Sequence, residues 1–431
     1  MPNDAPFTGG RLTNWAGNVA FSAARVHRPR SVGDLRKIVS SSRKVRALGT
    51  GHCFNRIADT PHDLVSVASL PGAIEIDTAT ATASVAAGLR YGEAAEQLHR
   101  AGFALPNLAS LPHISVAGAC ATATHGSGSS IGNLATAASA LEMVTADGDL
   151  VTLTRDDERN DDRFRGAVVS LGSLGIVTTV TLNLVPAFEV RQYVYEGLPA
   201  TELDEHFDEI FASAYSVSVF TDWQGERHRQ VWLKQRTGDP VTWDPGHDWH
   251  GARPASGPVH PVPGMDPANA TEQLGVPGPW HERLPHFRLE FTPSAGDELQ
   301  AEYLLPRHAA RPAMAAVASL RHRLAPVLQI AEIRTIAADE LWLSPSFQRD
   351  TVGLHFTLVR DPAAVAPVLA AVESELTPLG ARPHWGKLQF MRPDVLRGQY
   401  ARLDRFAALL REFDPAGKFR NEFIDTYVPR G

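Results

Sequence analysis

The fold is decided by the stretch Val45-Arg46-Ala47-Leu48-Gly49-Thr50-Gly51-His52-Cys53-Phe54-Asn55, which predicts a short apolar strand running into a glycine turn. Gly49 and Gly51 permit positive φ and a close approach of the backbone to another molecule. Successive backbone N–H groups in such a turn form a concavity that binds anions such as phosphate. The Gly-x-Gly-x-x-Phe spacing is one glycine short of the dinucleotide fingerprint, and no helix-forming run follows it. By itself the stretch therefore fits both a plain tight turn and a phosphate site.

The segments around this turn predict a β-α-β arrangement followed by further strands. Ser31 and Asp34 form an N-cap pattern, and apolar residues follow at helical spacing, so a helix leads into the strand before the turn. Beyond the turn, the sequence predicts strands at 64–67, 74–77, 83–88 and 179–182, a helix at 91–100 that ends at Gly102, and a hairpin at 141–153 around Asp147-Gly148.

A second informative segment, residues 107–128, consists almost wholly of small or hydroxyl-bearing residues. A helix in a core favours larger apolar side chains, and a surface loop favours more charge. The composition instead suits a backbone pressed against a large, flat, polar ligand. A packing seam of small residues is the alternative.

The pattern of predicted strands and helices changes after Pro186, which we interpret as a domain boundary. Alternating strands are predicted at 216–220, 230–234, 286–291 and 354–358, and helices at 311–324 and 362–376. Residues 238–285 are too rich in Pro, Gly and Trp for regular structure. This mixture predicts an α+β second domain.

Three short groups in the second half carry candidate chemistry. Glu332 and Arg334 project from one face of a predicted strand, either as an ion pair or as an acceptor and a donor fork for a polyhydroxylated ligand. His355 and Thr357 repeat this geometry, although a lone histidine on a strand is by default a core residue. Lys387 in His384-Trp385-Gly386-Lys387 can exchange protons near neutrality if burial lowers its pKa.

Composition narrows the function classes. The length of 431 residues predicts two domains. The net charge of -7 argues against nucleic-acid and anionic-membrane partners. Two cysteines exclude a disulfide framework, and no apolar run approaches the roughly 18 residues of a membrane span, so we expect a cytoplasmic protein without a membrane partner. His247 and His250 stand three apart in a Pro-rich loop without a carboxylate pattern, so no metal is assigned.

Taken together, several motifs resemble the vanillyl-alcohol-oxidase class of FAD proteins, and within it the alditol (xylitol) oxidases. The motifs are Gly-x-Gly-His-x-Phe-Asn at 49–55, Ser-Leu-Pro-His-Ile-Ser-Val-Ala-Gly at 110–118, Ala-Thr-His-Gly-Ser-Gly at 123–128, Glu-Ile-Arg at 332–334 and His-Trp-Gly-Lys at 384–387. The resemblance implies an α+β, two-domain, PCMH-type fold with FAD bound by residues 12–187. It also implies a substrate domain with an antiparallel sheet at 188–375 and a C-terminal segment, 376–431, that returns to the flavin.

The same resemblance implies that FAD is linked covalently to His52. Cys53 replaces the serine that is usual in the motif, and we do not expect it to form a second flavin link. The implied cofactor-binding residues are Gly49, Thr50, Gly51, His52, Cys53, Phe54, Asn55, Ser110, Ser115, Gly118, Thr122, Thr124, His125 and Ile176.

The reaction implied by the resemblance is the oxidation of a terminal alcohol of a polyol such as xylitol or sorbitol, with oxygen as acceptor and hydrogen peroxide as product, by a monomer. Lys387, Arg334 and His355 are the implied catalytic residues, and the implied substrate-binding residues are Ser110, Glu332, Arg334, Thr357 and Lys387. An aldonolactone oxidoreductase is the nearest alternative, and a redox-silent sugar-binding protein is a further one. Ala109 lies where a side chain could gate access of oxygen.

Overall fold

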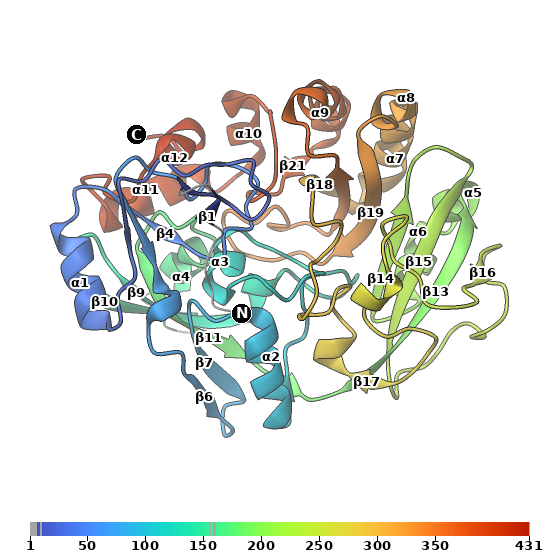
Figure 1. Cartoon of the computed structure of the whole chain (residues 1–431), viewed down its shortest axis with the longest axis horizontal. Coiled ribbons are helices and arrows are strands. Elements are labelled where there is room, and N and C mark those ends of the chain that lie inside the picture. The colour runs from blue at the N-terminus through green and yellow to red at the C-terminus, as the bar shows by residue number, and fades with distance from the viewer. Residues whose placement is uncertain (1–6, 9–10, 156, 158–160, 431) are drawn as a thin grey trace.

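Two sheets of the first half and one large sheet of the second half organise the chain (Figure 1). This computed structural model describes residues 7–8, 11–155, 157 and 161–430. Within these residues, no helix is both long enough and apolar enough to cross a membrane.

The first sheet is parallel and contains the strand that precedes the glycine turn. Its order is β3 (Arg25–His27), β5 (Asp63–Ser66) and β4 (Val45–Leu48), and α1 (Val32–Ser41) connects β3 to β4. The helix begins where the sequence predicts, because the Ser31 hydroxyl accepts a hydrogen bond from the Asp34 backbone N–H at 3.0 Å. The expected β-α-β arrangement is confirmed, with β5 inserted between the two strands.

The second sheet is antiparallel and has five strands. Its order is β10 (Leu150–Thr154), β9 (Ala138–Val144), β11 (Ile176–Asn183), β7 (Thr82–Ala86) and β6 (Ile74–Asp77). The predicted hairpin is confirmed, with Leu150 opposite Val144 and Gly148 at φ +85° in the turn. The helix α2 (Tyr91–Arg100) also has the predicted bounds.

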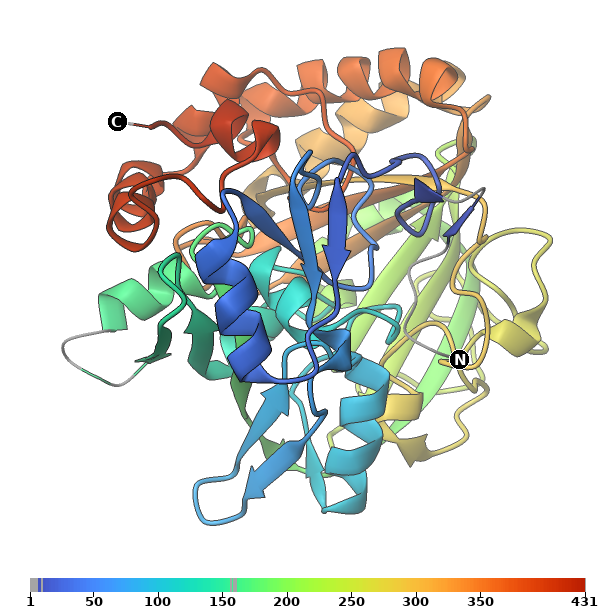
Figure 2. The same cartoon turned by 60° about the vertical axis from the view of Figure 1, so that its left-hand side comes forward.

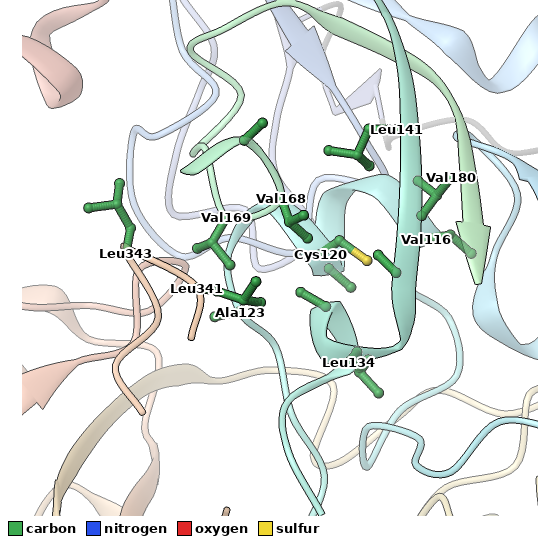
Figure 3. Packing of buried hydrophobic residues seen from close by; sticks show 14 of the residues in the cluster. Val116, Cys120, Ala123, Leu134, Leu141, Val168, Val169, Val180, Leu341 and Leu343 are labelled. Atoms are coloured by element: carbon green, nitrogen blue, oxygen red, sulfur yellow. The ribbon is translucent and has the colours of Figure 1, made fainter. Parts of the chain in front are cut away.

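The small-residue segment differs from the expectation, because it contains a short helix, α3 (Val116–Ala121). Val116 and Cys120 point into a core with Leu141 and Val180 (Figure 3), whereas Gly118 lines a cavity. Small residues thus do not prevent a helix here, since one face is buried and the other borders a cavity. Leu341 and Leu343 from the second half enter the same core (Figure 3).

The large sheet has nine strands and antiparallel pairing. Its main path is β16 (Arg253–Pro254), β13 (Glu189–Pro199), β15 (Arg227–Arg236), β14 (Ser216–Thr221), β19 (Leu328–Ile336), β20 (Thr351–Leu358), β18 (Leu299–Pro306) and β21 (Arg382–Pro383), with β17 (Gly278–Pro279) beside β13. The helices α7 (Ala310–Ser319) and α9 (Pro362–Leu376) pack together above it (Figure 1).

One predicted strand, residues 286–291, is wrong. The backbone N–H groups of His286 and Phe287 both donate to the Ser110 carbonyl, at 2.8 and 3.1 Å, instead of joining a ladder. The strand lies a few residues later, at β18, which places Gln300 and Glu302 in the sheet. The segment therefore fastens the loop at Ser110 to the second half.

The C-terminal helices return to the first half of the chain. They are α10 (Pro393–Gln399), α11 (Leu403–Phe413) and α12 (Glu422–Tyr427), and they lie near the blue N-terminal segments (Figure 2). Val45 N–H donates to the Lys418 carbonyl at 3.0 Å, and the Arg46 guanidinium donates to the Phe419 carbonyl at 2.8 Å. The strand before the glycine turn is therefore held by the end of the chain.

The remaining elements are short. They are β1 (Phe7–Thr8), β2 (Arg11–Leu12), β8 (Phe103–Ala104), β12 (Val185–Pro186), α4 (Asp161–Ala167), α5 (Ala200–Glu205), α6 (Phe207–Ala212) and α8 (Arg321–Leu324).

Candidate active site

A large cavity runs between the glycine turn, the small-residue segment and one face of the nine-stranded sheet. Its empty volume is about 2010 Å³, part of it open to solvent. One wall consists of backbone and small side chains from residues 46–58 and 109–125, and the opposite wall carries Glu332, Arg334, Thr357 and Lys387. The cavity is thus formed by both halves of the chain.

The glycine turn is shaped by contacts on both sides. Gly51 has φ +74°, and a Cβ at Gly49 would lie 2.7 Å from the Ser115 hydroxyl, so neither position suits a larger residue. Phe54 N–H donates to the Gly386 carbonyl at 2.8 Å, and the Asn55 side chain donates to the Trp385 and Lys387 carbonyls. These bonds fix the loop that carries Lys387 against the turn.

His52 presents a buried imidazole nitrogen without a partner. Its Nδ1 lies 3.1 Å from the Thr50 hydroxyl, its ring stacks on Trp15 at 5.4 Å, and its Nε2 has no hydrogen-bond partner among the residues that the structure describes. Burial, helped by the charge of Lys387, lowers the pKa of His52 to about 3, so the ring is neutral at physiological pH. An orphaned polar atom in a cavity calls for a bound group.

These features fit FAD. The turn offers backbone N–H groups for a pyrophosphate. Gly118 lines the cavity, and a Cβ there would lie 2.8 Å from the Ser115 hydroxyl, so a larger residue would crowd this wall. The neutral imidazole of His52 lines the same cavity.

The opposite wall is a charged network centred on Arg334. Its guanidinium donates to Glu302 Oε1 at 2.5 Å and to the Ser110 hydroxyl at 3.2 Å, and its Nε lies 3.7 Å from Glu332 Oε2. Burial raises the pKa of both carboxyls, but Arg334 outweighs it, so both stay well below their usual range and ionised. His286 Nε2 lies 2.9 Å from Glu332 Oε1 and completes this group.

Lys387 is the second cation of the wall. Its ammonium donates to the Gln300 side-chain carbonyl and lies 5.1 Å from the centre of the Phe54 ring. Burial lowers its pKa from 10.5, partly countered by Glu302. Gln300 in turn donates to Glu298, so a chain of polar groups positions the lysine.

His355 and Thr357 lie side by side on β20, with the Thr357 hydroxyl 3.4 Å from His355 Nε2. His355 Nδ1 lies 3.5 Å from Glu302 Oε2, and burial lowers its pKa. The histidine is therefore neutral and touches the charged network rather than a hydrophobic core.

The cavity brings together every predicted site residue except Ile176. Its lining includes Gly49, Thr50, Gly51, His52, Cys53, Phe54, Asn55, Ala109, Ser110, Ser115, Gly118, Thr122, Thr124, His125, Glu332, Arg334, His355, Thr357 and Lys387. Ile176 is fully buried in a separate core with Leu35 and Val39. Its neighbours Gly175 and Val177 line the cavity instead, because side chains alternate along a strand.

Several lining residues were missed from the sequence. They are His286, Glu298, Gln300 and Glu302. Gln300 and Glu302 alternate with Leu299, Ala301 and Tyr303, a period of two that could have identified this strand. His286 has no such signal, since it lies in an irregular loop.

Three buried groups, His125, Glu302 and His384, place possible metal-ligand atoms within 4.8 Å of one another. The Arg334 guanidinium already pairs with Glu302 at 2.5 Å. A second cation beside it would meet strong repulsion, so we interpret this cluster as part of the charged network.

Fold and cavity together define an FAD-dependent oxidoreductase of the vanillyl-alcohol-oxidase class. The family model described as FAD binding domain matches residues 23–154, and the one described as D-arabinono-1,4-lactone oxidase matches residues 297–427. An alditol oxidase from a Streptomyces species is 51% identical over 416 residues, which are 96% of this chain and 98% of that protein. The chain belongs to the alditol oxidase family.

More distant relatives support the class. An L-gulono-1,4-lactone dehydrogenase from Mycobacterium tuberculosis is 27% identical, covering 95% of this chain and 97% of that protein. An L-gulonolactone oxidase from Bos taurus is 24% identical, covering 97% and 98%. The crystal structure of a cholesterol oxidase from B. sterolicum shares the fold, with a TM-score of 0.75 at 16% identity over 97% of this chain and 96% of that one.

Proposed function

We propose that this protein oxidises a terminal primary alcohol of an alditol, such as xylitol or sorbitol, to the aldose and reduces oxygen to hydrogen peroxide. The observation that carries the proposal is one cavity with an FAD-type turn on one wall and Lys387, Arg334 and Glu332 on the other. The 51% identity to an alditol oxidase supports the same substrate class.

We further propose that FAD is attached covalently through His52. The support is the buried imidazole nitrogen without a partner and the pKa of about 3, which keeps the ring unprotonated and nucleophilic. Bound FAD supplies a two-electron acceptor for hydride and is reoxidised by oxygen.

Lys387 is proposed to accept the proton of the reacting hydroxyl. Its lowered pKa makes the neutral amine accessible, and Gln300 holds the nitrogen in place. Arg334 then stabilises negative charge on the substrate oxygen, since its guanidinium is fixed by Glu302 and Ser110. His355 contributes a neutral ring beside this pair.

Ser110, Glu332 and Thr357 are proposed to bind the hydroxyls of the polyol. The ionised Glu332 accepts hydrogen bonds, whereas the two hydroxyl groups can donate or accept them. Several fixed polar groups along one wall orient a flexible chain, which lowers the entropic cost of reaching a reactive geometry.

The proposed division of labour follows the chain. Residues 12–187 bind FAD, 188–375 bind substrate, and 376–431 bring Lys387 to the flavin side. We also propose a cytoplasmic monomer; the support for this compartment is that both cysteines, Cys53 and Cys120, are free.

Steady-state activity on xylitol, sorbitol and gulonolactone, with hydrogen peroxide measured, tests the function. We expect the polyols to be the better substrates. A clear preference for the lactone would favour the aldonolactone alternative, which the family-model match over 297–427 supports. Anaerobic xylitol should bleach the flavin, and yellow colour that stays with acid-precipitated protein tests the covalent link.

A further inference from the structure

We propose that Glu202, His206 and His250 form a binding site for a zinc-class divalent cation in the second half of the chain, outside the cavity described above. Glu202 belongs to α5, His206 joins α5 to α6, and His250 comes from the loop between β15 and β16. One ligand atom from each lies within 4.8 Å of the others. None of the three lines the cavity described above.

The separations suit a tetrahedral ion. Glu202 Oε2 lies 3.2 Å from His250 Nδ1 and 3.9 Å from His206 Nε2. Bonds of about 2.0–2.1 Å to zinc place neighbouring ligand atoms of a tetrahedron about 3.4 Å apart. Small side-chain rotations would therefore bring all three atoms onto one ion, with water in the fourth position.

Glu209 supplies the outer partner that metal-bound histidines require. Its two oxygens lie 3.3 Å from His206 Nδ1 and 3.7 Å from His250 Nε2, on the ring nitrogens that face away from Glu202. Metal-ligating histidines nearly always donate this second N–H to a carboxylate, carbonyl or water, which fixes the ring orientation. One carboxylate thus faces both outer nitrogens.

His250 lies at the tip of a tight, hydrogen-bonded turn with an unusual backbone conformation. The backbone groups of Trp249 and Ala252 exchange two hydrogen bonds of 2.9 Å, and His250 and Gly251 between them have φ +46° and +69°. Such a turn favours Gly, Asn or Asp, so a histidine at its first position is strained. Two imidazoles and a carboxylate favour zinc, cobalt, nickel or copper over magnesium or calcium.

An ion can reach this site from solvent, and once bound it would hold the loop that carries His250 against α5 and α6. The side chains of Glu202 and His206 are 37% and 42% exposed. The segment that follows β16 contributes Pro261 and Val262 to the cavity lining, so the metal would link α5 and α6 to a stretch of chain that continues to the substrate cavity.

Zinc titration of the tag-free, flavin-loaded, chelator-treated protein by calorimetry tests the site. We expect one zinc ion per chain, and cobalt in its place should give the absorption of a four-coordinate site. His206→Ala, His250→Ala and Glu202→Gln should each weaken binding at least about 100-fold, and Glu209→Gln about 10- to 100-fold. Flavin absorbance checks that every variant is folded.

His247→Ala is the matched control. His247 lies in the same loop as His250, and its side chain is 76% exposed. Its ion-pair partner is Asp244, at 2.8 Å, and not a residue of the cluster. Zinc binding should survive this change. The absence of zinc binding at millimolar zinc, or equal binding by wild type and His250→Ala, would overturn the proposal.

Discussion

The Arg334 guanidinium donates to Glu302 Oε1 at 2.5 Å and, through its other terminal nitrogen, to the Ser110 hydroxyl at 3.2 Å. Glu302 is 1% exposed, so Arg334 is the main group that compensates its charge. The proposed role of Arg334 is to stabilise charge on the substrate, and Glu302 holds its guanidinium in place for that role. We infer that Glu302 is a positioning residue.

The variant Glu302→Gln should retain FAD but reduce the rate of flavin reduction by xylitol about 10- to 100-fold. Loss of the charge leaves Arg334 buried with a weaker partner and free to turn away from Ser110. Stopped-flow reduction at saturating xylitol measures this rate. Glu373→Gln is the control, because Glu373 is buried and bonded to Tyr303 but lies outside the cavity lining. Equal rates in both variants would contradict the positioning role.

Lys387→Met should abolish flavin reduction by polyols while the spectrum of the bound flavin stays intact. The change removes the proposed proton acceptor but keeps a side chain of similar length beside Phe54. We expect a loss of about 10²- to 10⁴-fold, the usual contribution of a general base. Anaerobic reduction by xylitol gives the measurement, and an unchanged rate would remove Lys387 from the mechanism.

Flavin reduction by xylitol should accelerate as pH rises. Lys387 accepts a proton only as the neutral amine, and burial lowers its pKa from 10.5, so the active fraction grows with pH and levels off below that value. Glu302 and Glu332 do not contribute, because their pKa values lie below 4.5 and both remain ionised. The reduction rate measured over a pH series provides the profile. A profile that is flat across neutral and alkaline pH would argue against a titrating lysine.

Much of the first half could be predicted because its signals are local. Ser31 caps α1, Gly102 ends α2, and Asp147-Gly148 turns the hairpin, each through bonds within a few residues. The strand predicted at 286–291 failed because the backbone of His286 and Phe287 bonds to Ser110, far away in sequence. Long-range partners of this kind leave no periodic pattern.

The same distinction applies to the site. Glu332, Arg334 and Lys387 stand in short motifs that resemble a known family, so they could be named from the sequence. The alternating pattern around Glu302 could have identified its strand, but its position opposite His355 becomes clear only when β18 pairs with β20. Ile176 shows the reverse case, because the family resemblance implies that it binds the cofactor, whereas its side chain lies in another core.

Arg46→Met should lower the free energy of unfolding by about 3–5 kcal/mol, since a buried charged fork is removed and its acceptors lose their donor. The guanidinium donates to the carbonyls of Gly172, Phe419, Ile57 and Leu171, at 2.5 to 2.8 Å. Urea unfolding followed by tryptophan fluorescence measures the change. Arg100→Met, which removes an exposed pair with Glu96, should cost about 0.5 kcal/mol or less. Similar losses in both variants would contradict this role of Arg46.

Cys53→Ser should leave the covalent flavin in place, whereas His52→Ala should abolish it. Burial raises the pKa of Cys53 to about 11, so the thiol stays protonated and weakly nucleophilic at physiological pH. His52 next to it has a pKa of about 3 and a free nitrogen, so it is the available nucleophile. Serine is the residue usual at this position of the motif, and it adds no bulk. The space there is tight, because a Cβ built at Gly386 would lie 3.1 Å from Cys53 Sγ.

Acid precipitation and the intact mass of each variant distinguish the two residues. Wild type and Cys53→Ser should carry the added mass of one FAD and keep their yellow colour in acid. His52→Ala should release its flavin into the supernatant although FAD still binds the native protein reversibly, because the turn and the small residues around the cavity are unchanged. Flavin that remains attached in His52→Ala and is lost in Cys53→Ser would reverse the assignment and make the thiol the point of attachment.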